Sequence, residues 1–282
     1  MDNKKIITET EKYVFNTYIR FPLAIEKGDG MKVRDVEGNE FLDFTSGLAV
    51  NNSGHCHPKI VNAIKKQAEK LGHISNFFYN VPQLELAKCL IKNSFADKIF
   101  FCNSGAEANE AAIKLARIYS YKKWGEKKYF IATMKNSFHG RTIACLTATG
   151  QEKFQKGFPP LVPGFTYIPF NDTSVLKKEN FKNFCAIMVE PIQGEGGVNC
   201  PDKEYLLTLS RFCKENNILL IFDEIQVGIG RTGSLFAYEH FGVEPDIMTL
   251  AKALGGGLPL GAMLAKEEVA KAFTPGTHAS TF

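Results

Sequence analysis

A lysine closes one of the apolar runs of this sequence. Lys252 follows DIMTLA and stands just before three glycines, residues 255–257. Lysine is rarely buried without a partner, and burial lowers the pKa of its amine from about 10.4 toward neutrality. A neutral amine is a nucleophile that forms Schiff bases with carbonyl compounds. A lysine that extends to solvent from a strand end is the alternative, but the glycines leave room for a flat molecule or a closely approaching loop.

An aspartate closes a second apolar run. Asp223 follows ILLIF, and a carboxylate at the end of a buried strand is costly unless it is paired or hydrogen-bonded. It fits a counter-ion for a cofactor cation, a metal ligand, or a structural cap or salt bridge. Asp223 and Glu224 together could hold Mg²⁺, but the sequence contains no GxxxxGK[ST] loop that would bring a nucleotide to them.

A stretch of small residues follows a third apolar run. Ser104, Gly105 and Ala106 come after KIFFC (98–102) and open an expected helix. Small residues let backbone N–H groups approach an anion, and a helix N-terminus carries about half a positive charge. The stretch therefore predicts a phosphate site, with a simple N-cap at Ser104 as the structural alternative.

Two other motifs resemble binding sites, one for a dinucleotide and one for a metal, but their context argues against both. GIGRTG (228–233) matches a dinucleotide fingerprint, but it lies late in the chain and away from a first strand–helix turn, which disfavours a nicotinamide site. GHCHP (54–58) lacks further ligands at a usual zinc spacing, so we expect no metal site.

The elements that must position these residues follow a regular rhythm from residue 98 onward. The apolar runs are KIFFC (98–102), KYFIAT (128–133), FTYIPF (165–170), FCAIMVE (184–190), NILLIFDE (217–224), DIMTLAK (246–252) and LGAMLA (260–265). Amphipathic helices are expected between them, over 105–124 and 203–216. This alternation predicts an α/β fold with a mostly parallel sheet covered on both faces, which carries its chemistry at the carboxyl ends of the strands.

The first hundred residues read differently. We expect helices over 8–19, 58–71 and 82–94, the last two opening on Pro58 and Pro82. KVRDVEGNEFLDF (32–44) alternates around a turn and predicts a β-hairpin.

Composition limits the function classes. The net charge of +4 in 282 residues is spread along the chain, which argues against nucleic-acid or membrane partners. The N-terminus has no apolar signal segment, and no apolar run reaches 18 residues. Seven cysteines without a CxxC pair favour free thiols in a reducing cytoplasm.

Five motifs in order resemble one family. NSGAEANEAAIKLAR, FHGRT, VEPIQGEGG, DEIQVGIGRTG and AKALGGGLPLGAML are similar to the class III pyridoxal-phosphate aminotransferases of fold type I. The resemblance implies a three-layer α/β/α cofactor-binding large domain over 54–282. Residues 1–53 would belong to a small domain. Family members continue past the position of Phe282 into the rest of that domain, so we expect this chain to be C-terminally truncated.

The resemblance also implies a set of cofactor contacts. These residues are Ser104, Gly105, Ala106, Phe138, Asp223, Glu224, Ile225, Gln226, Lys252 and Thr281. Lys252 would form the Schiff base with pyridoxal 5′-phosphate. Asp223 would pair with the pyridine nitrogen and keep it protonated. Phe138 would stack on the ring, and Gln226 would reach its hydroxyl. The residues from Ser104 to Ala106 would bind the phosphate.

Substrate contacts follow in the same way. Arg141 would clamp the substrate carboxylate farthest from the reacting amine, because a guanidinium binds a carboxylate with two hydrogen bonds. Glu195 resembles the acid that pairs with a C-terminal arginine and switches the site between its two donors. Ser280 and Thr281 match a stretch that crosses a dimer interface to the substrate and to the neighbour's phosphate.

Within the family, GHCHP, HISNFFYNVPQ and GTHASTF are most similar to the members that act on acetylornithine. The expected reaction moves the δ-amine of N²-acetylornithine to 2-oxoglutarate and gives N-acetylglutamate 5-semialdehyde and glutamate, a step of arginine biosynthesis. It would run by a ping-pong mechanism through Lys252 in a homodimer. Another ω-aminotransferase, acting on succinylornithine, ornithine or 4-aminobutyrate, is the close alternative. An inactive remnant that only binds cofactor is the other.

Overall fold

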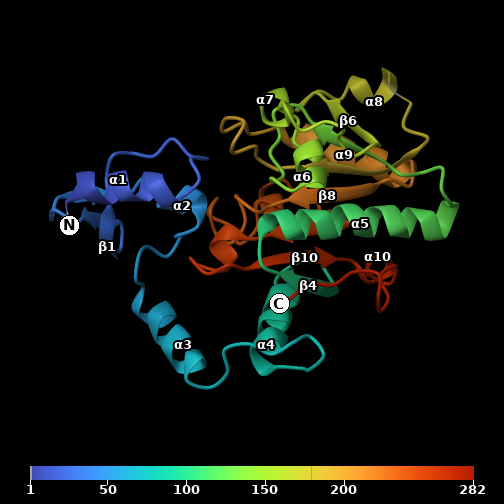
Figure 1. Cartoon of the computed structure of the whole chain (residues 1–282). Helices are drawn as coiled ribbons and strands as arrows, with labels where there is room; N and C mark the ends of the chain where they lie inside the picture. The colour runs from blue at the N-terminus through green and yellow to red at the C-terminus, as the bar shows by residue number, and fades with distance from the viewer. Residues whose placement is uncertain (1, 179) are drawn as a thin grey trace. The chain divides into compact units, whose positions relative to one another are not determined.

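The computed structural model describes residues 2–178 and 180–282 (Figure 1). The chain divides into two compact units, one reaching to Gly72 and the other running from His73 to Phe282. Across the described residues, no helix is both long and apolar enough to cross a membrane.

The first unit contains a small antiparallel sheet with helices. Its elements are α1 (Asn3–Tyr13), β1 (Ile25–Asp29), β2 (Lys32–Asp35), β3 (Glu40–Leu42), α2 (Ser46–Ala49) and α3 (Pro58–Ala68), with the strands in the order β1-β2-β3. The predicted hairpin over 32–44 is confirmed, because β2 pairs antiparallel with β3. The predicted helix over 8–19 is wrong in its limits. It begins at Asn3 since the Asp2 carboxylate accepts the N–H of Lys5 at 2.7 Å.

The second unit is built on a seven-stranded sheet. Its strands are β4 (Lys98–Cys102), β5 (Phe130–Met134), β6 (Phe165–Ile168), β7 (Phe184–Val189), β8 (Leu219–Asp223), β9 (Ile247–Leu250) and β10 (Gly261–Ala265), in the order β4-β10-β9-β8-β7-β5-β6. Its helices are α4 (Val81–Lys92), α5 (Gly105–Trp124), α6 (Ile143–Ala148), α7 (Glu152–Gln155), α8 (Val175–Lys178), α9 (Lys203–Glu215), η1 (Ala237–His240), η2 (Lys252–Leu254) and α10 (Glu267–Ala270). Each predicted apolar run thus overlaps one strand, and β5 extends one residue past its run.

Strand direction places most strand ends at one edge. Strands β6, β5, β7, β8 and β9 pair parallel in succession. Strand β10 runs antiparallel to both β9 and β4, so β4 points the same way as the parallel strands. The prediction of a mostly parallel sheet is confirmed, and the carboxyl ends of six strands share one edge.

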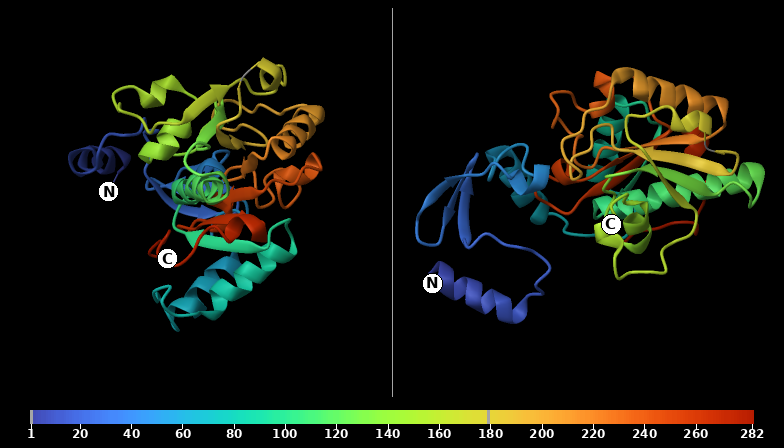
Figure 2. Two further views of the ribbon diagram at one scale, coloured as in Figure 1. Left: turned by 90° about the vertical axis from the view of Figure 1, so that its right-hand side faces the viewer. Right: turned by 90° about the horizontal axis from the view of Figure 1, so that it is seen from above.

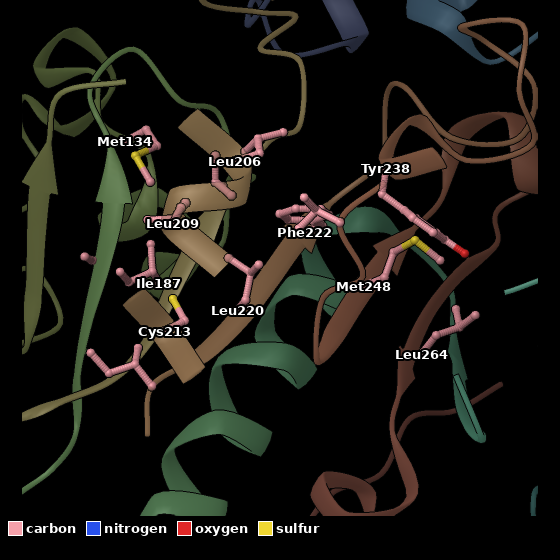
Figure 3. Close-up of a cluster of buried hydrophobic side chains, with 14 of the residues drawn as sticks. Met134, Ile187, Leu206, Leu209, Cys213, Leu220, Phe222, Tyr238, Met248 and Leu264 are labelled. Carbon is pink, nitrogen blue, oxygen red and sulfur yellow. The ribbon is translucent and has the colours of Figure 1, made fainter. Parts of the chain in front are cut away.

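Helices cover both faces of this sheet (Figure 2). Along β8, Leu220 and Phe222 pack in the cluster that contains α9, whereas Ile221 packs in the cluster that contains α5. This alternation follows from the two-residue period of a strand. Figure 3 shows the α9 side, where Leu206, Leu209 and Cys213 meet the strand residues. The three-layer α/β/α prediction is therefore confirmed.

Helix α5 fits its sequence closely. The Ser104 hydroxyl caps its first turn. Alanines at 108, 111, 112 and 116 are fully buried and bring the helix close to the sheet. The helix ends where Gly125 takes a positive φ of 74°, a conformation that favours glycine. Because α5 begins directly after β4, its N-terminus lies at the edge where the parallel strands end.

Candidate active site

Four strand ends bring three predicted chemical groups and one further carboxyl group to one edge of the sheet in the second unit. Lys252 follows β9, Asp223 ends β8, Glu190 follows β7, and Ser104 follows β4. These residues are far apart in the sequence, and the shared strand direction gathers them. The predicted edge of the sheet is therefore the edge that carries the candidate site.

Asp223 is held by a buried hydrogen-bond network. Its Oδ2 accepts from Asn109 Nδ2 and lies 2.7 Å from both that atom and His139 Nδ1. Its Oδ1 accepts from the N–H of Ile225 at 3.0 Å. Thr249 Oγ1 in turn donates to Asn109 Oδ1 at 2.7 Å. These partners satisfy both oxygens of a carboxyl group that is only 4% exposed, so the side chain of Asp223 is held in one position at the strand edge.

His139 and Glu190 extend this network. Burial acts to lower the pKa of His139, but the hydrogen bond and charge of Asp223 and the charge of Glu190 outweigh it and raise the pKa. Burial raises the pKa of Glu190 to about 7, although His139 opposes this. Within the described part of the chain, the buried Nε2 of His139 has no hydrogen-bond partner. The hydrogen-bond network that begins at Asp223 thus ends at a ring nitrogen of His139 whose hydrogen-bonding capacity is unused among the described residues.

Lys252 has the environment that the sequence predicts for it. Burial lowers the pKa of its amine, while the charges of Asp223, Glu190 and Glu195 act in the opposite direction. Its φ is +46°, an uncommon conformation for a residue with a side chain. A lowered pKa leaves more of the amine neutral, and a neutral amine is the nucleophilic and basic form.

The start of α5 has a side-chain cap and first N–H groups without a partner inside the helix. Ser104 Oγ accepts from the N–H of Glu107 at 3.2 Å, so the N-cap alternative is correct. The first N–H groups of a helix, here those of Gly105 and Ala106, have no partner within the helix. A Cβ on Gly105 would lie 2.9 Å from Ile225, so glycine is required where the loop after β8 packs on this turn.

The remaining cofactor candidates after β8 divide into two groups. Ile225 and Gln226 face the other site loops, and a Cβ on Gly194 would lie 1.5 Å from Gln226 Oε1. The carboxylate of Glu224 instead accepts from the N–H groups of Ala237 and Tyr238 at 2.6 and 2.7 Å. Its side chain therefore supports η1, and its contact with cofactor stays a prediction.

Phe138 and Arg141 lie in the loop after β5. The N–H of Phe138 donates to Glu190 Oε2 at 3.1 Å, which joins this loop to the end of β7. The guanidinium of Arg141 lies 5.3 Å from the centre of the Phe138 ring, and its residue is exposed. Glu195 is also exposed, in the loop after β7. The loop after β5 thus carries an aromatic ring and a guanidinium side by side, next to the end of β7.

The C-terminal segment lies against the start of α5 within the same chain. Asn103 Nδ2 donates to Ser280 Oγ and to the carbonyl of Thr281, each at 3.2 Å. Ser280 Oγ donates to Glu107 Oε1 at 3.1 Å. These bonds bring Ser280 and Thr281 to the predicted phosphate site, and a role across a dimer interface stays a prediction.

Sequence reasoning missed four polar residues of this site: Asn109, His139, Glu190 and Thr249. His139 lies inside FHGRT and Glu190 inside VEPIQGEGG, so both motifs were recognised without these side chains. All four are buried. A polar residue inside an apolar run or on the buried face of a helix is the signal that could have found them.

The weaker motifs have other surroundings. GIGRTG forms a loop in which Gly233 N–H donates to the carbonyl of Gly230 at 3.2 Å, and the next helix begins only at Ala237. His55 of GHCHP lies 2.7 Å from Asp43 Oδ2. Over residues 2–178 and 180–282, there is no group of three or more His, Cys, Asp or Glu side chains that could hold a metal.

Together these groups define a class of enzyme. The site offers a partly buried amine, a buried carboxylate, an aromatic ring and a helix N-terminus, all at the carboxyl edge of a mostly parallel sheet. These groups fit the aldehyde, ring nitrogen, ring face and phosphate of pyridoxal phosphate respectively. The family model of class-III aminotransferases matches residues 13–282, and the chain belongs to this family. It is a transaminase whose cofactor is pyridoxal 5′-phosphate.

Individual relatives agree with this assignment. The chain is 58% identical over 277 residues to an acetylornithine aminotransferase of Caldanaerobacter subterraneus subsp. tengcongensis, covering 98% of this chain and 70% of that protein. Among solved structures, the ornithine aminotransferase of Toxoplasma gondii superimposes with a TM-score of 0.95 at 36% identity, covering 100% of this chain and 68% of that one. The acetylornithine aminotransferase of Elizabethkingia anophelis gives 0.86 at 39% identity, covering 100% and 69%.

Proposed function

We propose that this chain transfers the δ-amine of N²-acetylornithine to 2-oxoglutarate, forming N-acetylglutamate 5-semialdehyde and glutamate. The observation that carries the proposal is the convergence of Lys252, Asp223 and the α5 N-terminus in a chain that is 58% identical to an acetylornithine aminotransferase. An amino-acid donor and a 2-oxoacid acceptor are consistent with the family, so the specific donor is the finer element of the proposal.

Lys252 would be the catalytic base and acid. Pyridoxal phosphate, when bound, supplies an electron sink conjugated to the substrate amine. The amine of Lys252 would remove the proton from the δ-carbon of the substrate and return it to the other end of the same conjugated system. The lowered pKa of Lys252 favours this role, because the neutral amine must be available near neutral pH.

Asp223 and the start of α5 would hold the cofactor. The Asp223 carboxylate, fixed by Asn109 and His139, would stabilise a proton on the ring nitrogen. Ser104, Gly105 and Ala106 would bind the phosphate through the positive end of the helix. Phe138 would pack on the ring face, and Gln226 would bind the ring hydroxyl.

Two charged residues would select the substrate. Arg141 would bind the α-carboxylate of acetylornithine with paired hydrogen bonds. Glu195 would assist the exchange between acetylornithine and glutamate, as the family resemblance implies. Both side chains are exposed at the site edge, which leaves them accessible to a substrate.

A homodimer in the cytoplasm is part of the proposal. In the second unit, Phe77 and Tyr79 are 92% and 105% exposed, and such neighbouring aromatic side chains favour contact with another protein surface. All seven cysteines are free thiols, which suits a reducing compartment.

The first test compares amine donors. Steady-state rates with acetylornithine, ornithine, succinylornithine and 4-aminobutyrate should give the highest kcat/KM for acetylornithine. An equal kcat/KM for ornithine would contradict the assignment to acetylornithine. Transfer from ornithine is the second candidate function, because the chain is also similar to the ornithine aminotransferase of Toxoplasma gondii.

The reactive lysine is tested separately from the donor. Borohydride reduction of the holoenzyme should attach the cofactor to the peptide that contains Lys252. Lys252→Ala should abolish this attachment and lower kcat by about 10²–10⁴-fold or more. Lys266→Ala is the matched control, because Lys266 pairs with Asp246 away from the site. Attachment to a different lysine would disprove the role of Lys252.

A further inference from the structure

One aromatic residue contacts both the predicted ring-stacking residue and the predicted carboxylate clamp. The Phe154 ring meets the Phe138 ring edge-on, with centres 5.7 Å apart and planes at 81°. The guanidinium carbon of Arg141 lies 4.2 Å from the centre of Phe154, closer than its 5.3 Å distance to Phe138. Phe154 is therefore the ring on which Arg141 mainly rests.

This ring is held in place by hydrogen bonds on both sides of it. Phe154 lies in the short helix α7, between Gln151 and Gln155. Gln151 Nε2 donates to the carbonyl of Ser137 at 3.0 Å, next to Phe138. Gln155 Nε2 donates to the carbonyl of Thr149 at 2.8 Å. These side-chain bonds tie α7 to the loop after β5 and to the end of α6, so the position of Phe154 is coupled to that of Phe138.

Stacking suits a carboxylate clamp for a physical reason. A guanidinium attracted to a ring by the cation–π interaction uses its flat face, and its five N–H donors remain directed outward in the guanidinium plane. Arginine has many side-chain rotamers, and holding one of them before binding lowers the entropy lost when a ligand binds. A ring beneath Arg141 therefore prepares it for a carboxylate without competing for its donors.

We propose that Phe154 is a positioning residue that sets specificity for carboxylated amines by holding Arg141 in its clamping orientation. This inference rests on the proposed function, in which Arg141 binds the substrate α-carboxylate. It adds a residue outside the recognised motifs, and it predicts that the aromatic character of position 154 matters more than its volume.

The test uses two donors that differ only in the carboxylate. N-Acetyl-1,4-diaminobutane is acetylornithine without its carboxylate. Phe154→Leu keeps an apolar side chain and removes the ring, so KM for acetylornithine should rise about 3–10-fold with kcat within about twofold. KM for N-acetyl-1,4-diaminobutane should not change. Phe154→Tyr should restore KM for acetylornithine, and Phe158→Leu, the same change at an exposed ring, should leave it unaltered.

A binding measurement separates this inference from the proposed function. N-Acetylnorvaline has the carboxylate and acyl group of acetylornithine but no reactive amine. Its Kd, from calorimetry, should rise by the same factor in Phe154→Leu as KM does, and Arg141→Ala should remove the difference between Phe and Leu at position 154. Equal KM increases for both donors, or a Leu effect that persists without Arg141, would overturn the inference. A wild-type enzyme that binds N-acetylnorvaline but does not turn over acetylornithine would overturn the proposed function alone.

Discussion

Asp223 Oδ2 and His139 Nδ1 lie 2.7 Å apart in a pair that is almost completely withdrawn from solvent. The pair links the end of β8 to the loop after β5, and Asn109 of α5 donates both to Asp223 and to the carbonyl of His139 at 2.7 Å. Three elements of the site are thus joined at one carboxylate. A charge in this position is stable only while its partners remain.

Replacing His139 tests this dependence. His139→Leu leaves the Asp223 carboxylate buried with fewer donors, so the free energy of unfolding should fall by about 3–5 kcal/mol. Urea denaturation of the cofactor-free protein measures the change, with the exposed His73→Leu as control. Cofactor affinity, measured by fluorescence titration, should fall as well. A variant within about 0.5 kcal/mol of wild type would show that the pair does not stabilise the fold.

The raised pKa of Glu224 predicts that the free energy of unfolding depends on pH. Burial raises its pKa to about 7 from 4.5, against two hydrogen bonds from backbone N–H groups. The folded state therefore binds this proton more tightly than the unfolded state. The resulting stabilisation is complete below about pH 4.5 and is lost as the pH rises through 7, and Glu190 contributes with the same sign.

The measurement is the unfolding free energy between pH 5 and 8. Each such carboxyl contributes a slope of at most about 1.4 kcal/mol per pH unit. Glu224→Gln should make the decline shallower, whereas the exposed Glu268→Gln should leave it unchanged. An identical decline in Glu224→Gln and wild type would exclude Glu224 as a source.

Gly194 tests the position of Gln226. A Cβ at residue 194 would meet the flexible end of the Gln226 side chain, so Gly194→Ala should displace that end with little effect on folding. Cofactor affinity should fall about 2–10-fold, the value of one hydrogen bond, and Gln226→Ala should give the same loss. The double variant should lose no more than either single one. Gly72→Ala, which adds a Cβ in open space, is the control. If the losses of cofactor affinity from the two single variants add in the double variant, Gly194→Ala does not act through Gln226.

Thr281 tests the shared site. If it binds the phosphate of a neighbouring subunit, Thr281→Ala should weaken cofactor affinity about 2–10-fold and leave the absorbance at saturating cofactor unchanged. Thr208→Ala on α9 is the control. Sedimentation of the active enzyme gives the assembly state, and full activity in a monomer would disprove a site that needs two subunits.

The strands were predictable from sequence because each is a short apolar run bounded by polar residues. KIFFC matches β4 residue for residue, and ILLIF matches most of β8. The helix expected over 8–19 was misplaced: α1 ends at Tyr13, and apolar residues after it, such as Phe15 and Ile19, lie exposed in this unit. The spacing of apolar residues does not reveal whether another protein surface covers them.

The chemistry at strand ends was predictable for residues that break an apolar pattern, such as Lys252 and Asp223. The partners of Asp223 were not, since they lie 114 and 84 positions away in the sequence and no local spacing joins them. The direction of the Glu224 side chain was equally hidden, because adjacent residues of a loop can face different elements. Phe154 carried no signal at all: a single aromatic in a short helix looks like an ordinary packing residue.

The reversed strand β10 has a consequence for how the protein is made. Strand β10 joins β4 to the rest of the sheet, and the helix after β4 also reaches β8 directly, through the hydrogen bond of Asn109 to Asp223. More than 150 residues separate β4 from β10, the strand that pairs with it, so this pairing forms only after most of the chain has been synthesised. The site is therefore completed late in synthesis, because a nascent chain that ends before β10 can form the Asn109–Asp223 hydrogen bond but lacks the strand that holds β4 in the sheet.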